Sequence, residues 1–281
     1  MTDGTDQPTT GPGGTDDPVI DLLADSWASL CTLADDLPDE AFALPSPLTG
    51  WTVQDCFSHV IGTERSLLGD PPPDVDISGC THAVSPFQQM MEVWVQARRD
   101  ATPAEIRAEL ATTVADRLAA LRAMTEAELS VPGWSPIGEV PYREFMKVRV
   151  FDCWMHEQDI RRATGRPGHE SGPVVDSALD NITRALGFIV GKRAGAPDGS
   201  SVVFRTTGGN QIVRSVVVDG RAAVVPDVPP SPTVELTMPF VTFVALAGGR
   251  IDAAQGVAEG ATVDGDADLG GRVLASMAFT P

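Results

Sequence analysis

Residues 51–59 read Trp-Thr-Val-Gln-Asp-Cys-Phe-Ser-His, and this stretch combines a helix start with side chains that can do chemistry. Thr52 and Asp55 have the spacing of a capping box, so a helix is predicted from here to about Leu68. Asp55 and His59 are four residues apart, and one helical turn takes about 3.6 residues. Their side chains are therefore expected on one face of this helix.

The same five-residue pattern recurs at residues 152–156, which read Asp-Cys-Trp-Met-His, inside a predicted helix from Pro141 to Thr164. Two such helices can form the two walls of one site. Histidine nitrogen and carboxylate oxygen suit zinc or a similar ion, and catalytic metals commonly take three protein ligands and keep one position open. We therefore predict a metal site made by His59, Asp152 and His156.

These residue types also have simpler explanations. A lone helical histidine is about as often a hydrogen-bonded core residue as a ligand, and the capping box already explains Asp55. Asp152 lies mid-helix among apolar neighbours, where an unpaired carboxylate would be costly to bury. Asp159 either orients a metal-bound imidazole or lies at a solvated helix end. Cys56 and Cys153 are predicted to be small buried hydrophobic residues.

The rest of the chain divides into a helical part and a β-rich part. Apolar residues at helical spacing predict further helices at 18–33, 86–100 and 103–124, and these helices together suggest a bundle. After residue 200, short Val- and Thr-rich runs with turns such as Asp219-Gly220 are typical of a β-meander. The predicted strands are 202–205, 212–218, 222–225 and 233–238, and the predicted later helices are 174–194, 239–246 and 266–276. The expected fold is a four-helix bundle followed by a small α+β domain with an antiparallel sheet.

Composition excludes several classes of protein. The chain has 281 residues and a formal net charge of −19, which argues against nucleic acid as a partner. It has no apolar run of about 18 residues for a membrane span, and its start lacks the features of a signal peptide, so a cytoplasmic location is expected. Four cysteines without a CxxC pair do not suggest a disulfide framework. His82 and His169 are expected at the surface, and residues 1–17 are expected to form a disordered acidic tail.

Several stretches together resemble one known family, the mycothiol-dependent maleylpyruvate isomerases. The N-terminal stretches are Trp51-Thr52-Val53 with Asp55 and His59, Asp152 with His156, Asp159 and Ile160, and Gly165-Arg166-Pro167. The C-terminal stretches are 246–251, Gly265-Asp266 and 278–281. The resemblance implies a DinB-like metal-binding bundle over residues 18–170 and a sterol-carrier-protein-like α+β domain over residues 171–281.

The resemblance also implies cofactors and roles. The family holds a zinc ion with residues that map onto His59, Asp152 and His156; its better-known member has Glu at the acidic position, one methylene longer than Asp152. Zinc or another divalent metal is thus the expected cofactor and mycothiol the expected cosubstrate, with the metal lowering the thiol pKa. An arginine of the second domain is expected to hold the substrate's carboxylate, with Arg250 the first candidate and Arg272 the second.

The leading hypothesis is a metal-dependent enzyme that uses a low-molecular-weight thiol, acting on a small-molecule electrophile without a nucleic-acid or membrane partner. It would be an isomerase of a maleylpyruvate-like unsaturated acid or a thiol S-transferase, working as a monomer or small homo-oligomer. The alternative is a non-catalytic binding, carrier or regulatory module. Thiol-dependent turnover separates the two, because a binding module shows none.

Overall fold

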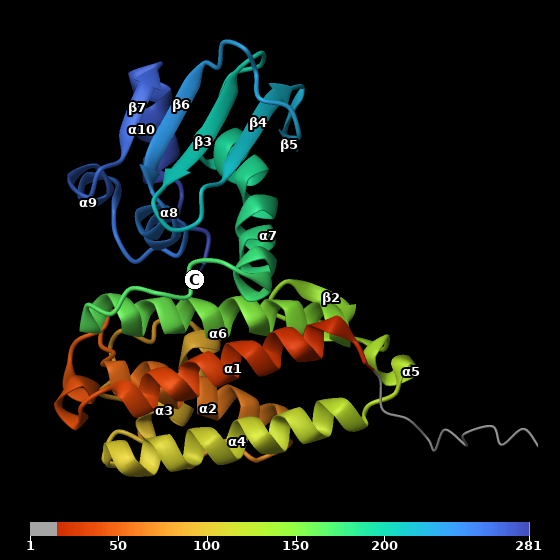
Figure 1. Ribbon diagram of the computed structural model, residues 1–281, viewed down its shortest axis with the longest axis vertical. Helices are drawn as coiled ribbons and strands as arrows, with labels where there is room; N and C mark the ends of the chain where they lie inside the picture. Colours follow the sequence, from red (N-terminus) through yellow and green to blue (C-terminus); the bar gives the residue numbers. More distant parts are fainter. Residues whose placement is uncertain (1–15, 281) are drawn as a thin grey trace, which may run out of the picture.

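The computed structural model describes residues 16–280, so nearly all of the predicted tail lies outside the described residues. Four long helices form the N-terminal bundle: α1 (Pro18–Asp36), α2 (Val53–Leu67), α4 (Pro103–Ala123) and α6 (Tyr142–Thr164). The smaller elements are a 3-10 turn (Asp39–Ala43), α3 (Pro86–Gln96), α5 (Glu126–Leu129), and the hairpin of β1 (Pro132–Ser135) and β2 (Gly138–Pro141). Figure 1 shows α6 along the side of the bundle that faces the second part of the molecule. The predicted helical bundle is confirmed.

The second part is a five-stranded sheet with helices packed against it. Its helices are α7 (Pro173–Phe188), a π-helical turn (Ile189–Arg193), α8 (Phe240–Ala247), α9 (Ala253–Ala258) and α10 (Ala267–Ala275). Its strands are β3 (Ser201–Thr207), β4 (Val213–Asp219), β5 (Arg221–Val225), β6 (Val234–Pro239) and β7 (Thr262–Gly265). The order in the sheet is β5-β4-β3-β6-β7. The predicted α+β fold is confirmed, and three of the four strand pairings are antiparallel as predicted. The short elements α9 and β7 were not predicted.

The predicted meander is correct for β3, β4 and β5 but wrong for β6. Strand β6 pairs in parallel with β3, on the side of β3 away from β4. The connection before it, residues 226–232, contains four prolines, which fix φ and remove backbone donors. This segment therefore crosses back over the sheet instead of closing a tight hairpin.

Capping signals set the helix boundaries near the site. The hydroxyl of Thr52 accepts from the N–H of Asp55, and the carboxylate of Asp55 accepts from the N–H of Thr52, which confirms the capping box. Helix α6 ends at Gly165, whose φ of 65° is left-handed and favours glycine. Helix α3 is shorter than predicted. It ends at Gln96, and residues 97–100 form turns.

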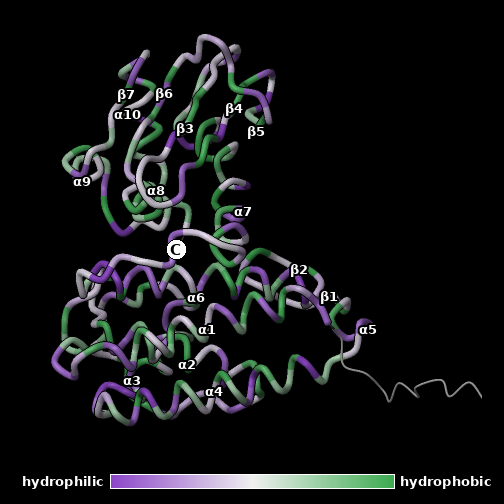
Figure 2. The backbone as a smooth tube through the Cα atoms, viewed as in Figure 1, coloured by the Kyte–Doolittle hydropathy of each residue, from purple (hydrophilic) through white to green (hydrophobic). Residues whose placement is uncertain are grey.

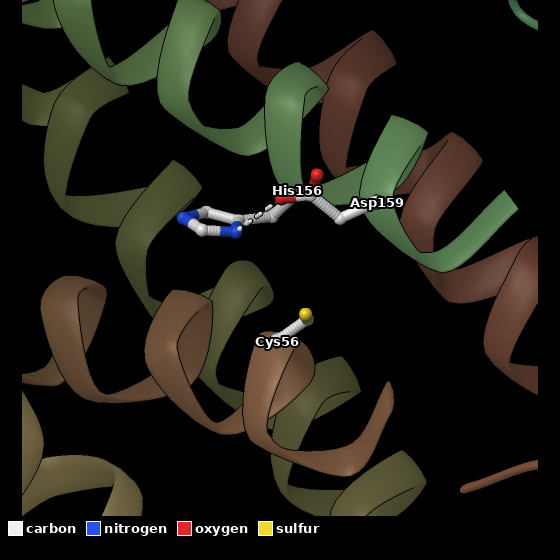
Figure 3. Close-up of side chains that lie close together, drawn as sticks. All are labelled: Cys56, His156 and Asp159. Atoms are coloured by element: carbon white, nitrogen blue, oxygen red, sulfur yellow. Dashed lines mark ion pairs between the residues drawn. The ribbon is translucent and has the colours of Figure 1, made fainter. Parts of the chain in front are cut away.

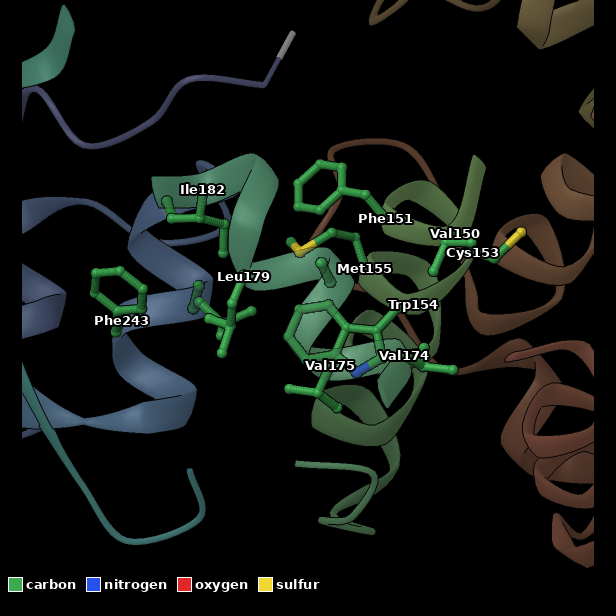
Figure 4. Close-up of a cluster of buried hydrophobic side chains, with 14 of the residues drawn as sticks. Val150, Phe151, Cys153, Trp154, Met155, Val174, Val175, Leu179, Ile182 and Phe243 are labelled. Carbon is green, nitrogen blue, oxygen red and sulfur yellow. The ribbon is translucent and has the colours of Figure 1, made fainter. Parts of the chain in front are cut away.

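One hydrophobic core joins the two parts of the molecule. Figure 4 shows Trp154 and Met155 of α6 beside Val174 and Val175 of α7, and further along α7 its side chains approach Phe243 of α8. Figure 2 shows hydrophobic and hydrophilic residues alternating along the bundle helices, as expected of helices with one buried face. Helix α7 contacts both α6 and the sheet, so the boundary between residues 170 and 171 stays a prediction. Among the described residues, no helix is long and apolar enough to cross a bilayer.

Helices α2 and α3 approach closely at Gly62, and this contact gives a stability prediction. An ideal Cβ on Gly62 would lie 2.3 Å from Cβ of Trp94, so Gly62→Ala forces the two helices apart. We expect the free energy of unfolding to fall by about 1–3 kcal/mol, as for other overpacked cores. The control is Gly271→Ala in α10, where no heavy atom is near the added methyl group; it is expected to stabilise by about 0.4–1 kcal/mol. Urea unfolding measures both changes, and equal effects would contradict the prediction.

Candidate metal site

The three predicted ligands meet between α2 and α6. Nε2 of His59 lies 3.2 Å from Oδ2 of Asp152, and Nε2 of His156 lies 3.7 Å from Oδ1 of the same carboxylate. One ligand atom from each residue lies within 4.8 Å of those of the other two. The doubled pattern thus identified side chains that the fold brings together. Its fourth member, Asp55, stays with its helix cap and Arg99, as the capping explanation predicts.

The protonation states of His59 and Asp152 suit a metal. Burial lowers the pKa of His59 and outweighs the opposite effect of Asp152. Burial opposes ionisation of Asp152, but the charge of Arg149, with the two histidines, holds the pKa of this carboxyl well below its usual value. Metal binding requires neutral imidazoles and an ionised carboxylate. Nδ1 of His59 is buried and has no hydrogen-bond partner among residues 16–280, so Asp152 is the polar side chain that its imidazole meets. These observations fit a divalent cation held between His59, Asp152 and His156.

A buried charge network lies beside Asp152. Arg149 donates to Oδ2 of Asp152 at 2.5 Å and to Oε1 of Glu64 at 2.9 Å. Arg117 donates to the other oxygen of Glu64 at 3.0 Å. Glu64 is fully buried, and the four formal charges cancel. Arg149 therefore orients the candidate ligand Asp152, and Glu64 in turn holds Arg149.

Asp159 lies against the second candidate histidine. Its Oδ2 is 3.2 Å from Nδ1 of His156, close enough for an ion pair although not aligned as a hydrogen bond. Asp159 is buried, so it is not at a solvated helix end. This is the position from which a carboxylate orients a metal-binding imidazole.

Arg250 is placed where the two parts of the molecule meet. It donates two hydrogen bonds to the carboxylate of Asp159, at 2.9 and 3.0 Å. It also donates to the carbonyl of Gly248 and to the hydroxyl of Thr280, so four of its five N–H groups have acceptors. A pocket of about 230 Å³ between α6 and α8 is lined in part by Asp159 and Arg250. Arg272, the second candidate, instead donates to the carbonyl of Ala194 in the second part.

Cys56, His156 and Asp159 form a second close group, drawn in Figure 3, with the thiol on α2 facing α6. Burial, followed by the charge of Asp159, raises the pKa of Cys56 well above its usual value. The carboxylate of Asp159 is already paired with Arg250. A protonated thiol is a poor ligand, so this group fits a metal less well than the first.

Two predictions about histidines are corrected by the structure. His82 and His169 were expected at the surface, but their side chains are only 18% and 17% exposed. Nε2 of His82 lies 3.0 Å from Glu92, and Nδ1 of His169 lies 2.7 Å from Glu157. Both carboxylates are buried in the bundle, where an unpaired carboxylate is costly. The two loop histidines therefore pack against them instead of extending into solvent.

The cysteines give a prediction about reactivity. Cys56 and Cys153 are fully buried, as predicted, and burial raises the pKa of Cys153 to about 12. Cys153 is then almost entirely in the thiol form at pH 8, and the thiolate is the reactive form. A thiol reagent at pH 8 is expected to modify the partly exposed Cys31 and Cys80 quickly and the other two only after denaturation. Four equally fast thiols in the native protein would contradict this.

The chain is similar to known proteins in both sequence and fold. The sequence model of the mycothiol maleylpyruvate isomerase N-terminal domain matches residues 23–161, and the C-terminal domain model of the same family matches residues 176–272. A crystal structure of the mycothiol-dependent maleylpyruvate isomerase is similar with 19% identity and a TM-score of 0.56, covering 88% of this chain and 91% of that chain. A histidine-to-alanine mutant of that enzyme is similar with 18% identity, the same TM-score and the same coverage.

No curated protein matches the sequence. The two domain matches nonetheless follow one another along the chain and together span most of it. The solved structures share the same two-part fold over nearly their whole length. The chain therefore belongs to the mycothiol-dependent maleylpyruvate isomerase family.

Proposed function

We propose that this protein is a metal-dependent enzyme that uses a low-molecular-weight thiol, with mycothiol the thiol that its family favours. Its reaction is the isomerisation of a maleylpyruvate-like unsaturated acid or the transfer of the thiol to an electrophile. The observation that carries the proposal is the convergence of His59, Asp152 and His156 on one point between two helices. The four-residue spacing on α6 and the third ligand from α2 supply three ligands and leave room for another.

The three candidate ligands differ in their exposure to solvent. The side chains of His59 and His156 are 9% and 8% exposed, whereas that of Asp152 is 31% exposed. A thiol therefore reaches the site from the side of Asp152. A divalent cation bound there, zinc in the first instance, lowers the pKa of a thiol and so supplies a thiolate at neutral pH. Burial lowers the pKa of His59 and so favours its neutral form, and Arg149 keeps Asp152 ionised and in place.

Both candidate reactions begin with the same bond. The thiol sulfur adds to one carbon of the substrate's conjugated double bond, and the electron pair moves onto the adjoining carbonyl. In an isomerase the new single bond rotates and the sulfur then leaves, which restores the thiol and a trans double bond. In a transferase the carbanion takes a proton, and the thioether is released.

We propose that Arg250 meets the carboxylate of an acid substrate. Its position beside the pocket between α6 and α8 supports this role. One of its five N–H groups lacks an acceptor among the described residues, and a planar guanidinium is suited to carboxylates. The transferase is the second candidate, because four of the five N–H groups of Arg250 already have acceptors. An electrophile without a carboxylate would not need a hydrogen bond from Arg250.

The test combines metal analysis with turnover. Protein purified without chelator is expected to hold about one divalent metal per chain, and the metal-loaded protein to isomerise a cis-unsaturated keto acid only when mycothiol is present. Loss of a chromophoric electrophile to a thioether, without isomerisation, would identify the transferase. Protein that holds metal but turns over neither substrate with any small thiol would contradict the proposal and favour a binding module.

A further inference from the structure

Trp51 lies directly against both histidines of the metal site. Its ring centroid is 5.3 Å from that of His59 and 5.8 Å from that of His156, and both ring pairs are tilted. The two imidazoles themselves are 4.5 Å apart. The three rings therefore form one cluster, in which the indole contacts both ligands that come from different helices. Trp51 thus borders both imidazoles.

The indole is anchored by a carboxylate from a third helix. Nε1 of Trp51 donates to Oε2 of Glu92 on α3 at 2.9 Å. Glu92 is only 1% exposed, and it also faces Arg99 at 2.6 Å and His82 at 3.0 Å. A carboxylate this buried needs such partners, and three of them fix its position closely. The position of Trp51 is thus fixed by a residue of α3, whereas the candidate metal ligands come from α2 and α6.

The turn before Trp51 is fixed as well. Gly50 has a φ of 80°, and an ideal Cβ there would lie 2.4 Å from Nδ1 of His82. The close approach brings the loop that holds His82 onto the backbone next to Trp51. Glu92 therefore contacts His82 of this loop, the indole, and Arg99 in the turns that follow α3. The cluster leaves the indole little freedom to swing away from the imidazoles.

We propose that Trp51 is a positioning residue of the metal site, and that Glu92 sets its place. The indole restricts the rotation of both imidazoles, so that their Nε2 atoms keep facing Asp152. The inference rests on the proposed metal site, but it concerns metal binding rather than turnover. Groups that orient metal ligands typically change metal affinity by about 10–100-fold when they are removed.

The experiment titrates the metal-free full-length protein with Co²⁺ alone and records tryptophan fluorescence together with the visible absorption of Co²⁺. Wild type is expected to bind one equivalent and to lose the emission of Trp51, because a paramagnetic ion quenches an adjacent indole. Trp51→Phe is expected to abolish most of this quenching, and Trp51→Ala to weaken Co²⁺ binding about tenfold. The matched control is Trp134→Phe on the exposed β1–β2 hairpin, which is expected to behave as wild type.

Two further variants separate the anchor from general packing. Glu92→Ala is expected to weaken Co²⁺ binding about tenfold and to change the Co²⁺ absorption band. Glu92→Gln keeps an acceptor for the indole N–H and is expected to retain most of the affinity. Unchanged quenching and affinity in Trp51→Phe and Trp51→Ala would overturn the inference while leaving the metal site intact. Absence of Co²⁺ binding in wild type, or binding that His59→Ala does not reduce, would instead overturn the proposed site itself.

Discussion

Replacing both His59 and His156 by alanine is expected to leave the protein with less than one tenth of a metal ion per chain. The two imidazoles supply two of the three candidate ligands, and the remaining carboxylate of Asp152 is already paired with Arg149. A single carboxylate with a competing guanidinium does not hold zinc against buffer. Thiol-dependent turnover is expected to fall by at least about 10³-fold, since a Lewis-acidic metal contributes several kcal/mol to such reactions. Elemental analysis and mycothiol-dependent kinetics measure the two effects.

The control for this double variant removes an imidazole outside the site. His169→Ala loses a bond to Glu157 but touches none of the three ligands, so its metal content is expected to equal that of wild type. Far-UV circular dichroism checks that each variant is folded. A folded double variant that retains metal would assign the ion to other residues. The second group would then have lost His156 but would still offer Cys56 and Asp159. In that case Cys56→Ser would be the next variant.

Local signals account for the parts of the fold that were predicted correctly. The capping box of Thr52 and the left-handed Gly165 each act within a few residues. The start of α2 and the end of α6 therefore follow from the sequence. The parallel pairing of β6 with β3 does not, because it depends on which strands a long connection brings together. The short elements α9 and β7 have too few residues to show a hydrophobic period.

The site was predicted only in part for the same reason. His59 and Asp152 are 93 residues apart, and only the repeated Asp-to-His spacing and the family resemblance linked them. Arg149 lies three residues before Asp152 on the same helix, so its contact could have been predicted from spacing. The bond between Trp51 and Glu92 spans 41 residues and shows no pattern in either segment. Partners of this kind are decided by packing and become visible only in three dimensions.

The second large effect is expected from Glu64→Ala. Glu64 is fully buried and is the carboxylate that Arg117 and Arg149 share, with side chains only 2% and 5% exposed. Among the described residues, its removal leaves Arg117 without a carboxylate partner and Arg149 with Asp152 alone. Breaking a buried ion pair by removing one partner typically costs about 3–5 kcal/mol, because the remaining charge stays desolvated. Equilibrium unfolding of the metal-free protein in urea measures this loss.

A surface pair on the same helix provides the control. Glu144 and Lys147 of α6 form an ion pair three residues apart, with side chains 33% and 39% exposed. Glu144→Ala is expected to change stability by less than about 1 kcal/mol, because solvent screens the charges. If Glu64→Ala were no more destabilising than Glu144→Ala, the buried network would not stabilise the fold.

The variant also tests how the network acts on the metal site. In wild type Glu64 offsets part of the charge of Arg149, which leaves Asp152 available to a cation. Without Glu64, the full charge of Arg149 falls on Asp152 and repels a divalent ion from the same oxygen. Zinc affinity measured by chelator competition is therefore expected to fall about 10–100-fold, as for other groups that orient metal ligands. Loss of stability with unchanged zinc affinity would show that Glu64 supports the bundle but not the site.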